Sequence, residues 1–93
     1  MMNKGLSVKI SALLQAPCVR ILLFLYEKGE VRYTELTNLI VSRGTLSLNL
    51  KELDAEELIR RRVVTTKPIQ AYYSLTDKGM EIAKHFDKIK KKL

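Results

Sequence analysis

The chain has 93 residues, of which 46% are apolar, which suffices for one compact domain and leaves little length for a second. It carries 17 Lys and Arg against 10 Asp and Glu, and this net charge of +7 favours a polyanionic partner such as nucleic acid. No apolar run reaches the roughly 20 residues of a membrane-spanning helix, and the start lacks the cleavage pattern of a signal peptide. We therefore expect a cytoplasmic protein, and a single cysteine, Cys18, fits a reducing compartment.

Two helices are predicted in the first third of the chain. Apolar residues recur at helical spacing over 6–16, at Leu6, Ile10, Leu13 and Leu14. Pro17 ends that helix and suits the first turn of the next, over 17–28, because its missing amide needs no partner there. The second helix is apolar on most sides, as expected of a central core helix, and Gly29 predicts its end.

A helix-turn-helix pattern occupies residues 34–57. After a brief β-type piece at 31–33, Thr34 and Glu35 open a helix that carries Leu36, Leu39 and Ile40 on one side. Ser42, Arg43 and Gly44 make the turn, and the next helix runs from Thr45 to about Glu57.

A β-hairpin is predicted over 58–75. Its two β-type runs, 59–65 and 70–75, are joined by a turn that contains Pro68. Two helices, a basic strand, a turn and a second strand follow the order of a winged helix-turn-helix. The predicted fold is therefore mostly α with a small β-hairpin (α+β), in one winged helix-turn-helix domain over 1–93.

The helix from Thr45 can be divided by face. Leu46, Leu50 and Leu53 point to the core. The outward side chains suit a base-reading face. Leu48 can contact a thymine methyl, hydroxyls can donate or accept hydrogen bonds at base edges, and a lysine can bind phosphate or guanine. The predicted DNA contacts here are Arg43, Gly44, Thr45, Ser47, Leu48 and Lys51. The alternative for Leu48 is a lone exposed leucine, which is common.

Consecutive arginines follow in the first strand of the hairpin. Alternation puts Arg60 and Arg62 on one face with Val64, and Arg61 on the other with Ile59. We expect Arg60, Arg61 and Arg62 to contact phosphates, and Lys67 or Gln70 at the hairpin tip to enter the minor groove. The alternative is a solubilising charge run that pairs with Glu52, Glu56 and Glu57.

The last predicted helix, 76–93, begins with Thr76 as its N-cap. Its apolar residues step by four, three and four, at Ile82, Phe86, Ile89 and Leu93. We expect this seam to pack against a second copy of the chain, together with Leu6, Ile10 and Leu13, and to form a homodimer. Its recognition helices would then contact half-sites about one DNA turn, roughly 34 Å, apart on a palindromic operator. The alternative is an intramolecular lid.

The ordered series of segments resembles the HxlR-like winged-helix transcriptional regulators and, more loosely, the MarR and ArsR groups. The matching residues are Val19–Leu22, Tyr33–Leu36, Leu46–Leu53, Leu58–Arg61, Pro68 and Tyr73–Gly79. The resemblance implies a dimeric regulator whose helix from Thr45 reads a major groove and whose hairpin from Ile59 to Leu75 is the wing.

The chain departs from the family pattern at three places. Glu57 stands where the family has a glycine that ends the recognition helix in a left-handed conformation. Cys18 is present without the tryptophan that accompanies it in the family, so it is either a redox sensor or a small core residue. The paired cysteines of ArsR-type metal sensors are missing from the recognition region, which argues against a metal site.

No pattern of residues suggests an enzyme or a cofactor site. The one histidine of the chain, His85, is interpreted as a surface residue, and the sequence contains no nucleophile motif or phosphate-binding loop. The predicted function is sequence-specific binding of double-stranded DNA, most simply repression by occlusion of a promoter. The competing hypotheses are an architectural, chromatin-like DNA-coating protein and a winged helix that binds another protein.

Overall fold

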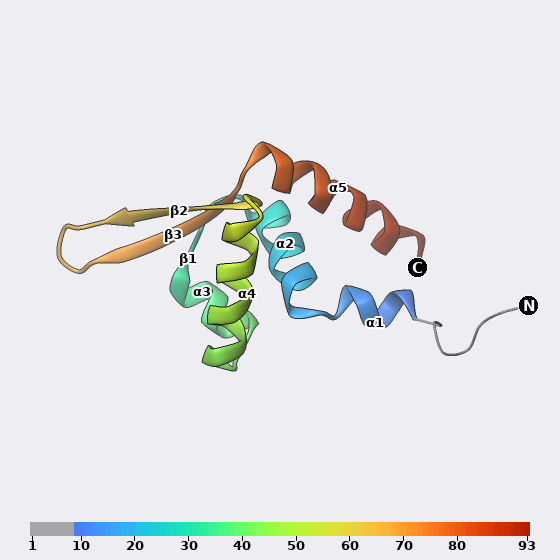
Figure 1. Cartoon of the computed structure of the whole chain (residues 1–93), viewed down its shortest axis with the longest axis horizontal. Helices are drawn as coiled ribbons and strands as arrows, with labels where there is room; N and C mark the ends of the chain where they lie inside the picture. The colour runs from blue at the N-terminus through green and yellow to red at the C-terminus, as the bar shows by residue number, and fades with distance from the viewer. Residues whose placement is uncertain (1–8) are drawn as a thin grey trace, which may run out of the picture.

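The structure is a computed structural model that describes residues 9–93, so Leu6 lies outside the described part. Five helices and three strands follow one another along this part (Figure 1). Their bounds are α1 Ile10–Leu14, α2 Pro17–Lys28, β1 Val31–Arg32, α3 Tyr33–Leu39, α4 Arg43–Ala55, β2 Ile59–Val64, β3 Gln70–Leu75 and α5 Asp77–Lys92. This arrangement confirms the predicted mostly helical winged helix-turn-helix.

Helix α2 lies at the centre of the core. It begins at Pro17, ends at Gly29 with φ 83°, and buries Ile21, Leu22 and Leu25, as its all-round apolar sequence predicts. The predicted inward face of α4, Leu46, Leu50 and Leu53, is buried in the same cluster. The helix-turn-helix is thus held to α2 by one face of α4, and the opposite face stays in solvent.

The three strands form one antiparallel sheet in the order β1-β3-β2. β1 pairs with β3 only at Val31 and Arg32, opposite Tyr73 and Tyr72, whereas β2 pairs with β3 along its whole length. The predicted β-type piece at 31–33 is therefore strand for two residues, and Tyr33 belongs to α3. The β2–β3 hairpin projects away from the helices as the wing (Figure 1).

Both helices of the helix-turn-helix begin earlier than the sequence predicts. α3 starts at Tyr33, where the Arg32 amide donates to the Glu35 carboxylate at 3.0 Å. α4 starts at Arg43, two residues before Thr45, because Ser42 is its N-cap and accepts the Thr45 amide at 3.3 Å. Good capping by Ser42 outweighs the weak helix propensity of a glycine in the first turn.

The end of α4 is closed by a residue in the left-handed conformation. The helix stops at Ala55, and Glu57 has φ 59°. The Glu57 amide donates to the Asp54 carbonyl and the Leu58 amide to the Leu53 carbonyl, each at 2.9 Å, which is a Schellman motif. Glu57 thus takes the left-handed conformation that a glycine has in the family, and the helix ends two residues earlier than predicted.

This helix end is joined to the start of α5. The Thr76 hydroxyl donates to the Glu57 carbonyl at 2.7 Å and accepts the Gly79 amide at 3.0 Å. The Gly79 backbone approaches so closely that a Cβ there would lie 1.9 Å from the Leu58 carbonyl oxygen. This approach therefore requires a glycine at position 79.

Helix α5 packs on α2 (Figure 1), and its apolar seam is divided. Ile82 and Phe86 pack against the protein's own core, while Ile89 is 40% and Leu93 72% exposed. Ile10 and Leu13 of α1 are also exposed. Among residues 9–93, no helix is long and apolar enough to cross a membrane.

Candidate nucleic-acid interface

The outward face of α4 carries the side chains that the sequence assigns to base reading. Ser47 and Lys51 are exposed, and Leu48 is 57% exposed beside them. Arg43 and Gly44 are also exposed at the start of the helix, and a Cβ at Gly44 would meet no atom within 4 Å. An approaching polyanion would therefore meet an open helix start.

Two polar groups on α4 are less free than their neighbours. The Asn49 side-chain amide donates to the Thr45 carbonyl at 2.8 Å, and both residues are half-buried. The Asn49 amide is thus partly used by its own helix. Thr45 is the least exposed of the predicted contacts on α4.

The wing contributes Arg61 to the same surface. A hollow of about 320 Å³ between α4 and the wing is lined by Ser47, Lys51 and Asp54 on the helix and by Arg61 and Tyr73 on the strands. Arg61 therefore lies on the side of the sheet that faces the recognition helix, and Arg61, Lys51 and Ser47 line one concave surface. A convex backbone such as that of a duplex fits such a surface.

The inner side of the wing also carries apolar residues that are not among the predicted contacts. A second hollow, of about 490 Å³, lies between the wing and the start of α3 and is lined by Arg32, Tyr33, Thr34, Arg61, Tyr73 and residues 68–71. Ile69 is 72% exposed near the wing tip, and Lys67 beside it is exposed too. The position of Ile69 in a turn between two strands was the available signal for an exposed apolar contact.

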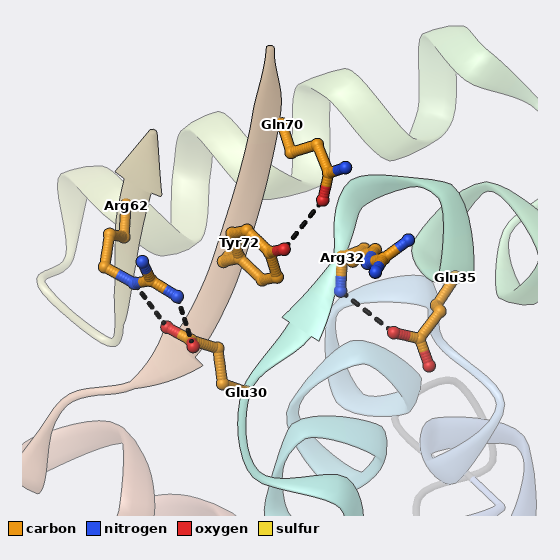
Figure 2. A network of polar contacts seen from close by, with 6 residues as sticks. All are labelled: Glu30, Arg32, Glu35, Arg62, Gln70 and Tyr72. Carbon is orange, nitrogen blue, oxygen red and sulfur yellow. Dashed lines mark hydrogen bonds and ion pairs between the residues drawn. The ribbon is translucent and has the colours of Figure 1, made fainter. Parts of the chain in front are cut away.

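Arg60 and Arg62 lie on the other face of the sheet. The register pairs Arg60 with Ser74 and Arg62 with Tyr72, so the alternation predicted from the sequence is confirmed. Arg62 donates to both carboxylate oxygens of Glu30, at 2.7 and 3.1 Å, and its guanidinium carbon lies 4.6 Å from the Tyr72 ring centroid (Figure 2). The partner of Arg62 is thus Glu30 and none of the three glutamates that the sequence offered.

The ion pair changes the acidity of both partners. Hydrogen bonds from Arg62 lower the pKa of Glu30 below its ordinary value of 4.5. The same hydrogen bonds raise the pKa of Arg62, so its guanidinium stays charged. Gln70 lies on the same face, where its side-chain oxygen accepts the Tyr72 hydroxyl at 2.7 Å (Figure 2).

The remaining candidate groups lie away from this surface. Cys18 is a half-buried free thiol packed against the core, and His85 is exposed on α5. At the C-terminal end, Lys91 pairs with Asp87 at 3.1 Å. Across the part of the chain that is described, no three His, Cys, Asp or Glu side chains gather as metal ligands would.

Residues 18–92 match the model of the HxlR-like helix-turn-helix family. The chain belongs to this family. It is 35% identical over 75 residues to the HTH-type transcriptional regulator YvaP of Bacillus subtilis, a match that covers 78% of this chain and 69% of YvaP. It is also 33% identical over 63 residues to YodB of the same organism, covering 66% of this chain and 56% of YodB.

Solved structures of regulators share the fold. The crystal structure of diamide-treated YodB has a TM-score of 0.67 at 27% identity and covers 97% of this chain and 90% of that one. A transcriptional regulator homologue from Pyrococcus horikoshii has a TM-score of 0.70 at 24% identity and covers 84% of this chain and 80% of that one. The HxlR-like protein is thus a transcriptional regulator with a winged helix-turn-helix fold, and its relatives are regulators, not enzymes.

Proposed function

We propose that this HxlR-like protein binds double-stranded DNA sequence-specifically as a homodimer on a palindromic operator and represses transcription by occluding a promoter. In this proposal the outward face of α4 enters the major groove and the wing tip reaches the adjacent minor groove. A cytoplasmic location is part of the proposal, because a transcriptional regulator acts where the chromosome lies.

The observation that carries the proposal is the continuous surface formed by α4 and the wing. Ser47 and Lys51 from the helix and Arg61 from β2 line one hollow, and the exposed Leu48 stands beside them. Cations and hydroxyls next to an apolar side chain are the groups needed for phosphate, base-edge and thymine-methyl contacts. Arg43, Gly44, Thr45 and Lys67 extend the proposed contacts at its borders. Arg60 and Gln70 lie on the other face of the sheet, and we propose them as phosphate and minor-groove contacts outside this surface. Arg62 is held by Glu30 and has a different role from these contacts.

A homodimer is supported by the exposed part of the apolar seam. Ile89 and Leu93 at the end of α5 and Ile10 and Leu13 of α1 remain exposed. α1 and the end of α5 lie at the opposite end of the molecule from the wing (Figure 1). A partner bound there leaves both recognition surfaces free, which a symmetric dimer on two half-sites requires.

The test is selection of bound fragments from a genomic library of duplexes, followed by sequencing. We expect an inverted repeat with half-site centres about 10 base pairs apart, and an affinity at least ~1000-fold above random duplex at equal salt. Equal binding of all fragments would show that the protein coats DNA in the manner of an architectural protein. No binding at low salt would leave the protein-binding winged helix as the function.

A further inference from the structure

Three side chains from three parts of the sheet meet on its outer face. Glu30 directly precedes β1, Arg62 lies on β2 and Tyr72 on β3 (Figure 2). Because the strand order is β1-β3-β2, Arg62 has to cross the middle strand to reach Glu30. It passes over the Tyr72 ring, 4.6 Å from the centroid, and ends in two hydrogen bonds to the carboxylate. We call Glu30, Arg62 and Tyr72 the wing clamp.

The base of the wing is held in the core by Ile59 and Tyr73, but within the described residues the part beyond Arg62 and Tyr72 has no third strand beside it. β2 and β3 pair with each other over six residue pairs, whereas β1 pairs with β3 over two. The outer part of the hairpin is therefore two-stranded, and two strands alone have little stability in water. The guanidinium of Arg62 is planar, and both its two hydrogen bonds to the carboxylate and its stacking on the ring depend on the orientation of that plane. These contacts are therefore directional. The wing clamp therefore restrains the direction in which the hairpin projects.

The same contacts leave Arg62 poorly suited to bind a phosphate. It faces away from α4, on the opposite side of the sheet from Arg61. Two of its nitrogens already donate to Glu30. A phosphate in that place would have to displace the carboxylate and would then lie close to it, and like charges repel.

We propose that Arg62 is a positioning residue: through Glu30 it fixes the direction of the wing and so places Arg61 and the wing tip for DNA. This rests on the DNA binding proposed above. Arg62 then strengthens binding without touching the duplex, and Glu30, although acidic, strengthens it as well. If Arg62 instead contacted a phosphate directly, Glu30 would weaken DNA binding, because its carboxylate would compete with the phosphate.

The deciding experiment measures affinity for the selected operator at constant salt. Glu30→Gln and Arg62→Gln should each weaken binding by about three- to tenfold, the double Gln variant should be no weaker than either, and the exchange Glu30→Arg with Arg62→Glu should recover most of the loss. Tighter binding by Glu30→Gln, with the exchanged pair the weakest variant, would show that Arg62 binds phosphate and would overturn the inference.

Hydrogen exchange of the β2 and β3 amides tests the clamp without DNA. Glu30→Gln and Arg62→Gln should speed exchange in the hairpin and leave α2 unchanged. The matched control is Arg60→Gln, on the same strand and face, for which no ion pair forms within residues 9–93. It should not speed exchange. If hydrogen exchange in the clamp variants equals that of the wild type, the inference is wrong. If exchange is faster in the clamp variants but the wild-type protein binds no DNA, only the proposed function is wrong.

Discussion

At the scale of single residues, Gly79 shows how a close backbone approach constrains the sequence. The Cβ of an alanine would lie 1.9 Å from the Leu58 carbonyl oxygen; the backbone fixes the Cβ position and the oxygen is itself a backbone atom, so a side-chain rotation cannot relieve the contact. Gly79→Ala should lower the free energy of unfolding by about 2–3 kcal/mol, measured by urea denaturation. Gly44→Ala is the control, because nothing lies within 4 Å there, and it should be neutral or slightly stabilising. Equal losses from both would contradict this account.

Glu57 predicts a substitution that stabilises the protein. Its φ of 59° is unfavourable for a residue with a Cβ, and only its backbone takes part in the Schellman motif. Glu57→Gly should raise the free energy of unfolding by about 0.5–1 kcal/mol, because relief of strain exceeds the added freedom of the unfolded chain. Glu56→Gly, at φ −87°, should instead destabilise. A lower melting temperature for Glu57→Gly would show that the left-handed glutamate is not strained.

The ion pair between Glu30 and Arg62 predicts a pH-dependent contribution to stability. The pKa of Glu30 in the folded protein lies below its ordinary value of 4.5, chiefly through hydrogen bonds from Arg62. The pair therefore stabilises the fold fully above that ordinary value, and its contribution is lost as the pH falls through the lower folded pKa. The difference in urea midpoint between wild type and Glu30→Gln should be largest at neutral pH and disappear in acid. A difference that persists in acid would mean that the carboxylate charge is not what matters.

At the scale of elements, local patterns predict helices and strands but not the contacts between distant segments. Leu46, Leu50 and Leu53 follow the helical period and are buried as predicted, because apolar residues at this spacing all lie on one face of a helix. Glu30 and Arg62 lie 32 residues apart, and nothing local to either indicates the other. The approach of Gly79 to Leu58 depends likewise on how α5 meets the end of α4. The sequence thus indicates which face of α4 is free, but not that Arg61 alone of the three arginines faces it.

Helix α4 gives a prediction about specificity. Leu48 is 57% exposed on the outward face, where an apolar contact distinguishes thymine but adds little attraction to phosphates. Leu48→Ala should weaken operator binding by about fivefold to tenfold and leave binding to random duplex nearly unchanged, as measured by fluorescence anisotropy. Met80→Ala, 45% exposed on α5, is the matched control and should change neither. Equal loss on operator and random duplex would remove Leu48 from the base contacts.

At the scale of the whole molecule, the two ends have separate roles in the proposal. Ile82 and Phe86 pack the first half of the α5 seam against the protein's own core, so among the described residues the seam offers a partner its second half, next to α1. Ile89 and Leu93 are 40% and 72% exposed there. A charge buried in an apolar interface is strongly unfavourable, so Ile89→Glu with Leu93→Glu should convert a dimer to a monomer in analytical ultracentrifugation.

The same variant connects assembly to DNA binding. One recognition surface contacts one half-site, so loss of the partner should reduce affinity for the full operator by about 100-fold or more, while affinity for an isolated half-site stays the same. Ile69→Glu is the matched control: Ile69 is 72% exposed at the wing tip, and this variant should stay dimeric while losing affinity for both sites. A double variant that sediments as a dimer would place the interface elsewhere, and one that is monomeric yet binds the full operator normally would show that a single copy is enough for recognition.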